Sequence, residues 1–484
     1  MQTQQQSESY KIYLQGQWVA TQREIEVINP ATEQVFARVS TVDSRQVQEA
    51  LRAAEGAFKA WRRLTAKERG TFLQRVADEV KRRQDEIARI ITLENGKPLA
   101  QSVAEVAMSE DHLRWFAEEG RRAYGRVIPH QVSGKRNFTV KTPIGVVGAI
   151  APWNFPLVLG VRKMAPALAA GCTVVLKPAS QTPLSSILFA ECVEAAGIPA
   201  GVFQLVVGDA RMIAQEFLRN PICRKISFTG STSVGQELIR EAAETVKPLS
   251  LELGGIAPLL VFDDCDLDQA VQQTLIAKFR NTGQSCIAAN RVYVQRTIRD
   301  KFLERFAAGV KKLKLSPGLE PGADVGPLIN RQALENALAQ IEDAVRHGGT
   351  VLCGGKRADM PGYFLEPTVI DGAAETMLCM QEETFAPIAP VAAFETEEEA
   401  ITYANRLPFG LSAYAMTRDI GCMFRLSEQI EAGTLGINDG APSTSTSPFG
   451  GMKQSGWGRE LGTEGLDAFL ETKHVSVGGI EERN

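Results

Sequence analysis

The sequence lacks a Cys-x-x-Cys pair, an excess of either charge, and an unbroken apolar run of the ~20 residues that cross a bilayer. Its 53 basic and 57 acidic side chains give a formal net charge of −4, so no strong positive field favours nucleic acid or an anionic membrane as a partner. Without cysteines at metal-ligand spacing, we expect no metal site. What remains is a globular chain of 484 residues, 44% hydrophobic, with room for two or three domains.

Disulfide, leader and membrane signals are also missing. The eight cysteines are scattered along the chain, which is typical of free thiols in a reducing compartment. The first ten residues are polar and Gln-rich and lack the features of a signal or transit peptide. The most apolar region, residues 144–161, is interrupted by Pro152 and Pro156. We therefore expect a cytoplasmic protein without a membrane segment.

Apolar periodicity predicts an α/β fold. After a strand-like start at residues 10–18, apolar residues recur at helical spacing as far as Ile91, so the opening part is expected to be helical. Short apolar runs then alternate with helix-like stretches, which indicates βαβ units and a parallel sheet. The strands predicted for this series are 145–150, 173–176, 202–207 and 225–228.

A second α/β series follows after Cys286. Two further segments, 122–142 and 464–479, fit neither series and are expected to be extended arms. Such arms either pair with another subunit or form ordinary surface hairpins. The strands predicted for the second series are 291–295, 365–369, 390–394, 412–416 and 434–437.

Three chemically complementary groups stand in separate turn-rich segments. Cys286 ends the run Phe-Arg-Asn-Thr-Gly-Gln-Ser-Cys, Glu252 precedes a glycine pair, and Asn154 lies in Pro-Trp-Asn-Phe-Pro. Each alone favours a packing role, but together they supply a nucleophile, a base and an oxyanion donor. A free thiol has a pKa of ~8.5, so Cys286 needs donors nearby, and Glu252 needs a pKa raised by burial. The set predicts covalent chemistry on a carbonyl.

Two strand ends suggest a dinucleotide site. The predicted strand 225–228 runs into the glycine turn at Gly230 and Ser231, although the spacing is not Gly-x-Gly-x-x-Gly. Lys177 and Ser180 close another strand, where ligands of open α/β sheets bind. Because serine tolerates a ribose 2′-phosphate that a carboxylate would repel, we expect NADP, with NAD also accepted. The alternative is that Lys177 is only a solvated strand end.

These motifs together resemble the aldehyde dehydrogenase superfamily, from the Asn-Pro-Ala-Thr turn at residues 29–32 to Pro-Phe-Gly-Gly-Met-Lys-Gln-Ser-Gly at 448–456. The resemblance implies a Rossmann-like NAD(P)-binding domain (1–121 and 143–253), an α/β catalytic domain (254–446) and small β oligomerisation arms (122–142 and 464–484). It also implies a homodimer or homotetramer. Cys286, Glu252 and Asn154 keep the roles given above. The cofactor-binding residues implied are Ile150, Pro152, Trp153, Lys177, Ser180, Gly230, Ser231, Val234, Leu253, Glu383 and Phe385.

The substrate side is similar to that of succinate-semialdehyde dehydrogenases. Arg162, Arg280 and Ser443 stand where relatives that oxidise apolar aldehydes carry aromatic residues, and two guanidiniums suit a small anionic aldehyde. Both arginines could instead be structural ion-pair partners. Ala288 replaces a second cysteine of that subfamily, so its redox switch should be absent. Ala386 and Ile256 are further departures, and they keep other substrates open: glutarate semialdehyde, other short ω-carboxy aldehydes, and sulfonated or phosphorylated small aldehydes.

Two other functions compete with a hydrolytic dehydrogenase. A coenzyme A-acylating dehydrogenase would pass its thioester to a thiol and need no water-activating base, so Glu252 argues against it. A protein that keeps this fold only for a binding or structural role would lack a catalytic group, yet none is missing.

Overall fold

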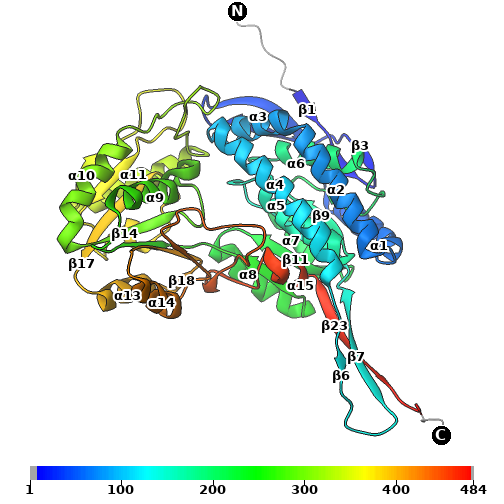
Figure 1. Cartoon of the computed structure of the whole chain (residues 1–484). Coiled ribbons are helices and arrows are strands. Elements are labelled where there is room, and N and C mark those ends of the chain that lie inside the picture. The colour runs from blue at the N-terminus through cyan, green and yellow to red at the C-terminus, as the bar shows by residue number, and fades with distance from the viewer. Residues whose placement is uncertain (1–7, 481–484) are drawn as a thin grey trace, which may run out of the picture.

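The computed structural model describes residues 8–480, which form two lobes, each built around a sheet, and a projecting arm (Figure 1). The Gln-rich start up to Ser7 and the last four residues of the second predicted arm lie outside the described residues.

The first lobe contains the predicted parallel sheet, with the strand order β10-β9-β8-β11-β12-β22. Its central strands are buried along their whole length, which is why the sequence shows them as continuous apolar runs. The strands are parallel except β22, which pairs antiparallel with β12. Their bounds are β8 Val146–Ile150, β9 Thr173–Lys177, β10 Phe203–Leu205, β11 Cys223–Thr229, β12 Leu249–Glu252 and β22 Gly456–Trp457.

Helices cover this sheet. Helices α1, α5 and α6 contact β8 to β10, whereas α7 and α8 contact β11 and β12; α2 to α4 pack outside them. The bounds are α1 Ser44–Trp61, α2 Ala66–Arg82, α3 Gln84–Asn95, α4 Leu99–Glu119, α5 Val158–Ala170, α6 Leu184–Ala195, α7 Ala210–Arg219 and α8 Thr232–Ala242.

The opening part is not wholly helical, so that expectation was wrong. Before α1, β4 (Glu24–Asn29) and β5 (Gln34–Ser40) form a hairpin, with β1 (Glu8–Tyr10) alongside β5. Charged and apolar residues alternate along β4, so one face is exposed and the apolar signal is weak. The predicted strand-like start also breaks in two, β2 (Ile12–Leu14) and β3 (Gln17–Val19), at a turn where Gln15 and Gly16 have positive φ.

The second lobe contains a sheet with the strand order β15-β16-β17-β14-β13-β19-β20. It begins before Cys286, because β13 (Ala257–Val261) and α9 (Leu267–Phe279) precede the nucleophile loop; strand β13 was not predicted from the sequence. The remaining elements are β14 Ala289–Gln295, α10 Arg299–Val310, α11 Arg331–Arg346, β15 Thr350–Cys353, β16 Thr368–Asp371, α12 Leu378–Gln381, β17 Ile388–Phe394, α13 Glu397–Asn405, β18 Phe409–Gly410, β19 Ser412–Met416, α14 Ile420–Gln429, β20 Thr434–Ile437 and β21 Met452–Lys453.

The two predicted arm segments form one arm. Strand β7 (Arg136–Pro143) pairs antiparallel with β23 (Leu470–Val477) over its whole length, and β6 (Val127–Ile128) lies on the other side of β7. The arm extends away from both lobes (Figure 1). The second segment is extended only from Leu470, because its first residues belong to α15 (Gly462–Asp467), which packs against α4 and α5.

Two further expectations can be compared with residues 8–480. All eight cysteines are free thiols. No helix in this part of the chain is long and apolar enough to cross a membrane.

Candidate active site

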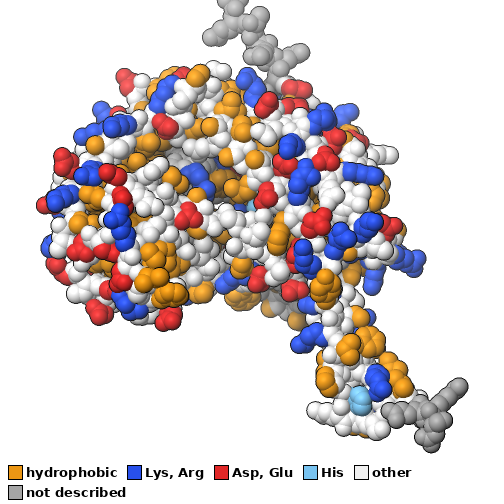
Figure 2. Space-filling model, in the orientation of Figure 1, with side chains coloured by type: hydrophobic (Ala, Val, Ile, Leu, Met, Phe, Trp, Pro, Cys, Tyr) orange, Lys and Arg blue, Asp and Glu red, His pale blue; other side chains and the backbone are white. Residues whose placement is uncertain are grey.

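A cavity of about 220 Å³ lies where the carboxyl ends of β8, β11 and β12 face the loop that carries Cys286. The surface is hollowed between the two lobes (Figure 2). This is the position at which open parallel sheets bind ligands. The cavity is lined by Pro152, Trp153, Asn154, Thr229, Gly230, Ser231, Leu253, Gly254, Cys286, Glu383 and Phe385, so the fold brings together nine of the residues predicted from the sequence.

The loop before Cys286 is held in an unusual backbone conformation. Asn281 and Thr282 have φ of 52° and 59°, and Gly283 has φ of 73°. A Cβ on Gly283 would lie 2.2 Å from the Ala386 carbonyl oxygen, so only glycine fits there. The Gln284 side chain accepts from the Ile329 N–H at 2.9 Å, which ties the loop to the body of the lobe. The nucleophile therefore sits on a rigid turn.

The Cys286 thiol lies at the cavity wall, surrounded by protein. Burial raises the pKa of Cys286 to about 12; Glu383 raises it further, while Arg162 lowers it. No hydrogen bond to its sulfur is formed within residues 8–480, so the donors expected from the sequence do not point at the sulfur. Burial therefore favours the protonated thiol.

Asn154 and Cys286, which line the same cavity, each have an N–H group available to a ligand. The buried Asn154 amide donates one N–H to the Gln284 carbonyl at 3.2 Å, which leaves its second N–H for a ligand. The backbone N–H of Cys286 has no acceptor in the described part of the chain. A pair of amide donors beside a nucleophile can hold a developing oxyanion.

Glu252 ends β12 and is buried, but it does not line the cavity. Its Oε2 is buried without a hydrogen-bond partner among the described residues. Burial, and next the neighbouring Glu460, raise the pKa of Glu252 well above 4.5, in the direction the sequence analysis required of a base. Glu460 forms an ion pair with Lys163 at 2.5 Å, and Lys163 also donates to the Thr229 hydroxyl at 2.6 Å. This buried pair was not predicted from the sequence.

Glu383 and Phe385 line the cavity together with Trp153. Burial raises the pKa of Glu383 to about 8, and its Oε1 accepts from the Gly255 N–H at 3.5 Å. Phe385 has a φ of 43°, rare for an aromatic residue, and its ring meets Trp153 edge-on at 5.5 Å. A strained residue held by its surroundings is typical of a ligand clamp.

A second cavity, of about 240 Å³, lies between α7 and α8, and Val234 is among its lining residues. The N-terminus of α8 separates it from the first cavity: Ser231 caps the helix by accepting from the Val234 N–H, and the Thr232 hydroxyl is buried without a partner among residues 8–480. Free N–H groups at a helix N-terminus between two cavities suit the pyrophosphate of a dinucleotide. These residues therefore fit NAD(P).

Ile150, Lys177 and Ser180 line neither cavity but lie at or just beyond the carboxyl ends of neighbouring strands in the same sheet. Lys177 is not a solvated strand end, because it is only 5% exposed and burial lowers its pKa to about 8. The Ser180 hydroxyl donates to the Gly208 carbonyl at 3.5 Å.

Cys286 also lines a third, small cavity of about 30 Å³. The walls of this cavity include Arg162, Arg280 and Ser443. Arg162 Nη2 donates to the Ser443 hydroxyl at 3.1 Å. Neither arginine forms an ion pair within residues 8–480, so the structural ion-pair interpretation was wrong. The apolar walls are Met108, Phe155, Val158, Leu159, Ile287 and Phe449. Phe155 and Phe449 stand in motifs quoted above and Ile287 follows Cys286, but none of the six was predicted as a pocket residue.

Both guanidiniums lie over aromatic rings. Arg162 stands 4.8 Å from the Phe449 ring centroid and Arg280 stands 5.7 Å from that of Phe155. Arg162 Nε is buried and has no partner in the described part of the chain. Cys286 thus lines both the first cavity and a cationic pocket.

Comparison with known proteins agrees with this geometry. The Aldehyde dehydrogenase family matches residues 18–475. The glutarate-semialdehyde dehydrogenase of Pseudomonas aeruginosa is 47% identical over 470 residues, covering 97% of both chains, and the 3-sulfolactaldehyde dehydrogenase of Pseudomonas putida is 46% identical over 471 residues, also covering 97% of both. The crystal structure of succinate-semialdehyde dehydrogenase from Burkholderia pseudomallei superposes with a TM-score of 0.96 at 45% identity, covering 97% of this chain and 98% of that one.

Proposed function

Because this chain belongs to the aldehyde dehydrogenase family, we propose that it oxidises succinate semialdehyde to succinate with NAD(P). The observation that carries the substrate proposal is the pair Arg162 and Arg280, which have no acidic partner within residues 8–480 and line a pocket that contains Cys286. A guanidinium without an acidic partner in a buried site favours an anionic ligand, and its planar fork binds a carboxylate through two parallel bonds. The small pocket favours a short chain between carboxylate and aldehyde.

The chemistry follows from the groups around the sulfur. The Cys286 thiol loses its proton to solvent, and the thiolate adds to the aldehyde carbon; the resulting oxyanion accepts from the Asn154 amide and the Cys286 N–H. Glu383 and Phe385 would hold the nicotinamide ring of NAD(P), which would supply the hydride acceptor. Loss of hydride from the former aldehyde carbon leaves a thioester on Cys286. Glu252 takes a proton from water, whose oxygen attacks the thioester, releasing the acid and the thiol.

NADP is the preferred cofactor in this proposal. Ser180 leaves room for a 2′-phosphate beside Lys177, whereas an acidic residue there would repel it. NAD lacks that phosphate and is accepted more weakly.

The proposal also covers the domains and the assembly. We assign residues 1–121 and 143–253 to cofactor binding, 254–446 to catalysis, and 122–142 with 464–484 to assembly as a homodimer or homotetramer. The arm supports the last assignment, because Val127 and Tyr124 expose 88% and 73% of their surface there. A cytoplasmic location stays a prediction from the sequence.

Other anionic aldehydes fit the same pocket chemistry. The similarity to a glutarate-semialdehyde and a 3-sulfolactaldehyde dehydrogenase favours these two classes as the second candidates. Transfer of the acyl group to coenzyme A needs no water-activating base. It is disfavoured because the buried Glu252 lies close enough to Cys286 to raise the pKa of the thiol.

The test is kcat/KM for succinate semialdehyde, glutarate semialdehyde, 3-sulfolactaldehyde and the uncharged four-carbon butanal, each with NADP and NAD. We expect the highest kcat/KM for succinate semialdehyde with NADP. The kcat/KM for butanal should be lower by at least about a hundredfold, since two charge-assisted contacts are lost. Equal values for butanal and succinate semialdehyde would overturn the proposal. Formation of acyl-CoA in place of free acid when coenzyme A is added would overturn the hydrolytic step.

A further inference from the structure

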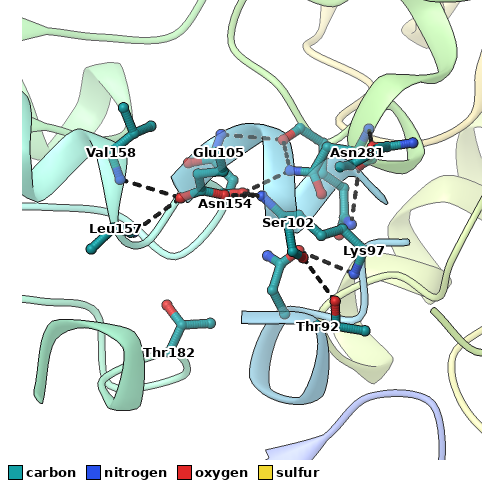
Figure 3. A network of polar contacts seen from close by, with 12 residues as sticks. Thr92, Lys97, Ser102, Glu105, Asn154, Leu157, Val158, Thr182 and Asn281 are labelled. Atoms are coloured by element: carbon teal, nitrogen blue, oxygen red, sulfur yellow. Dashed lines mark hydrogen bonds and ion pairs between the residues drawn. The ribbon is translucent and has the colours of Figure 1, made fainter. Parts of the chain in front are cut away.

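We propose that Lys97, Glu105 and Asn281 are positioning residues that fix the Asn154 amide beside Cys286, an inference that rests on the oxyanion role proposed for Asn154. None of the three lines the cavities that contain Cys286. They come from the α3–α4 turn, helix α4 and the nucleophile loop, and they converge on the Asn154 backbone (Figure 3).

The Lys97 side chain approaches Asn154 from the cofactor lobe. Its Nζ donates to the Asn154 carbonyl at 2.7 Å, pairs with Glu105 Oε2 at 2.6 Å, and lies 4.0 Å from the Phe155 ring centroid. The ammonium is therefore held from three directions. Its side chain is fully buried, so it cannot swing to water without local unfolding.

Glu105 fixes the chain on the other side of Asn154. Its second oxygen, Oε1, accepts from the N–H groups of Leu157 and Val158 at 3.0 and 3.3 Å, where α5 begins. A carboxylate at a helix N-terminus is stabilised by the helix dipole. One carboxylate thus joins the start of α5 to the ammonium that holds the Asn154 carbonyl.

Asn281 holds the same carbonyl from the catalytic lobe. Its Nδ2 donates to the Asn154 carbonyl at 2.7 Å and to the Gln284 carbonyl at 3.0 Å. The Asn154 side chain in turn donates to that Gln284 carbonyl. The Asn154 loop and the Cys286 loop, which belong to different lobes, are therefore pinned to each other through two shared carbonyls.

Stability alone does not account for this arrangement. A buried ion pair is often no more stable than an apolar pair of the same volume, because both charges lose their hydration. Burial lowers the pKa of Lys97, and Glu105 opposes that shift, which is the expected balance for such a pair. The polar groups fix the direction of the Asn154 backbone carbonyl. Because this carbonyl and the Asn154 side chain share one Cα, they also position the side-chain amide that faces the substrate oxygen.

Two variants each remove one side-chain donor to the Asn154 carbonyl and leave no unpaired buried charge. K97M/E105Q deletes both charges, and the side-chain amide oxygen that takes the place of the Glu105 carboxylate can still accept from α5. N281G removes the second donor and suits the φ of 52° at this position. The matched control is K247M, because Lys247 is also buried and its Nζ donates to the Leu218 and Asn220 carbonyls, away from Cys286.

The experiment measures hydride transfer in a single turnover with succinate semialdehyde and NADP, on active-site-titrated enzyme, together with thermal unfolding and alkylation of Cys286 by iodoacetamide. We expect K97M/E105Q and N281G each to slow hydride transfer by about 30-fold, less than the roughly 100- to 1,000-fold loss expected for N154A. Alkylation should stay within about twofold of wild type, because it forms no oxyanion. K247M should lower the unfolding temperature without slowing hydride transfer.

Combination with N154A separates positioning from general damage. If Lys97 and Glu105 act through the amide, K97M/E105Q should slow hydride transfer by less than about threefold in the N154A background, because the coupled losses are not additive. The full 30-fold loss in that background, or a wild-type rate for K97M/E105Q itself, would overturn the inference. Wild-type hydride transfer in N154A would instead refute the proposed oxyanion role on which the inference rests.

Discussion

Replacing Arg280 by methionine separates the charge of the substrate pocket from its shape. Methionine keeps most of the apolar stem, and Arg280 makes no side-chain hydrogen bond within residues 8–480, so little of the fold depends on its guanidinium. A charge-assisted hydrogen bond contributes about 1.5–3 kcal/mol, so loss of one arginine's contact with a carboxylate should lower kcat/KM by roughly 10- to 150-fold.

The assay compares succinate semialdehyde with butanal on the wild type and on R280M. We expect most of the loss to appear as a higher KM for succinate semialdehyde, because the carboxylate is bound equally in the ground and transition states. Butanal should change by less than about threefold, since it has no group for the guanidinium to bind. Equal losses on both substrates would refute the reasoning, since they would mean that Arg280 supports the shape of the pocket and not its charge.

Three further predictions concern the base and the cofactor site. The E252A variant should still release a burst of reduced cofactor equal to the number of active sites and then stop, because the thioester cannot be hydrolysed; a stopped-flow trace without a burst would contradict this order. In the wild type, thioester hydrolysis should accelerate as pH rises. Because the pKa of Glu252 is raised, its carboxyl stays protonated and cannot accept a proton until the pH passes that pKa. A hydrolysis rate independent of pH in acyl-enzyme decay measurements would count against Glu252 as the base. The S180D variant should lose at least about tenfold in kcat/KM for NADP and little for NAD, because a carboxylate repels the 2′-phosphate; equal losses would mean that Ser180 does not face the ribose.

The part of the fold that the sequence predicted best is the part that is buried on both faces. Strands β8, β9 and β11 read as apolar runs because nearly all of their side chains are covered. Strands β4 and β23 carry charged residues on exposed faces, so their apolar signal is weak or absent. Pairing of β7 with β23, more than 300 residues apart, leaves no trace in local periodicity.

The site was predictable where the residue type itself carries chemistry. Cys286 and Asn154 do line one cavity, as their motifs suggested, and Glu383, which the family resemblance implied, lines it too. The buried pair Lys163 and Glu460 could not be found, because neither residue stands in a motif and their contact exists only after α5 meets the C-terminal segment. The high pKa of the Cys286 thiol was equally hidden, since burial depends on the whole cavity and not on the neighbouring letters.

The central claim is that the substrate carbon becomes bound to the sulfur of Cys286. The most direct measurement is peptide mass spectrometry of the E252A variant, quenched in acid after turnover with succinate semialdehyde and NADP. We predict a succinyl group of about 100 Da on the peptide containing Cys286, in proportion to the reduced cofactor released. An unmodified Cys286, or a succinyl group on another cysteine, after a full burst of reduced cofactor would contradict the account.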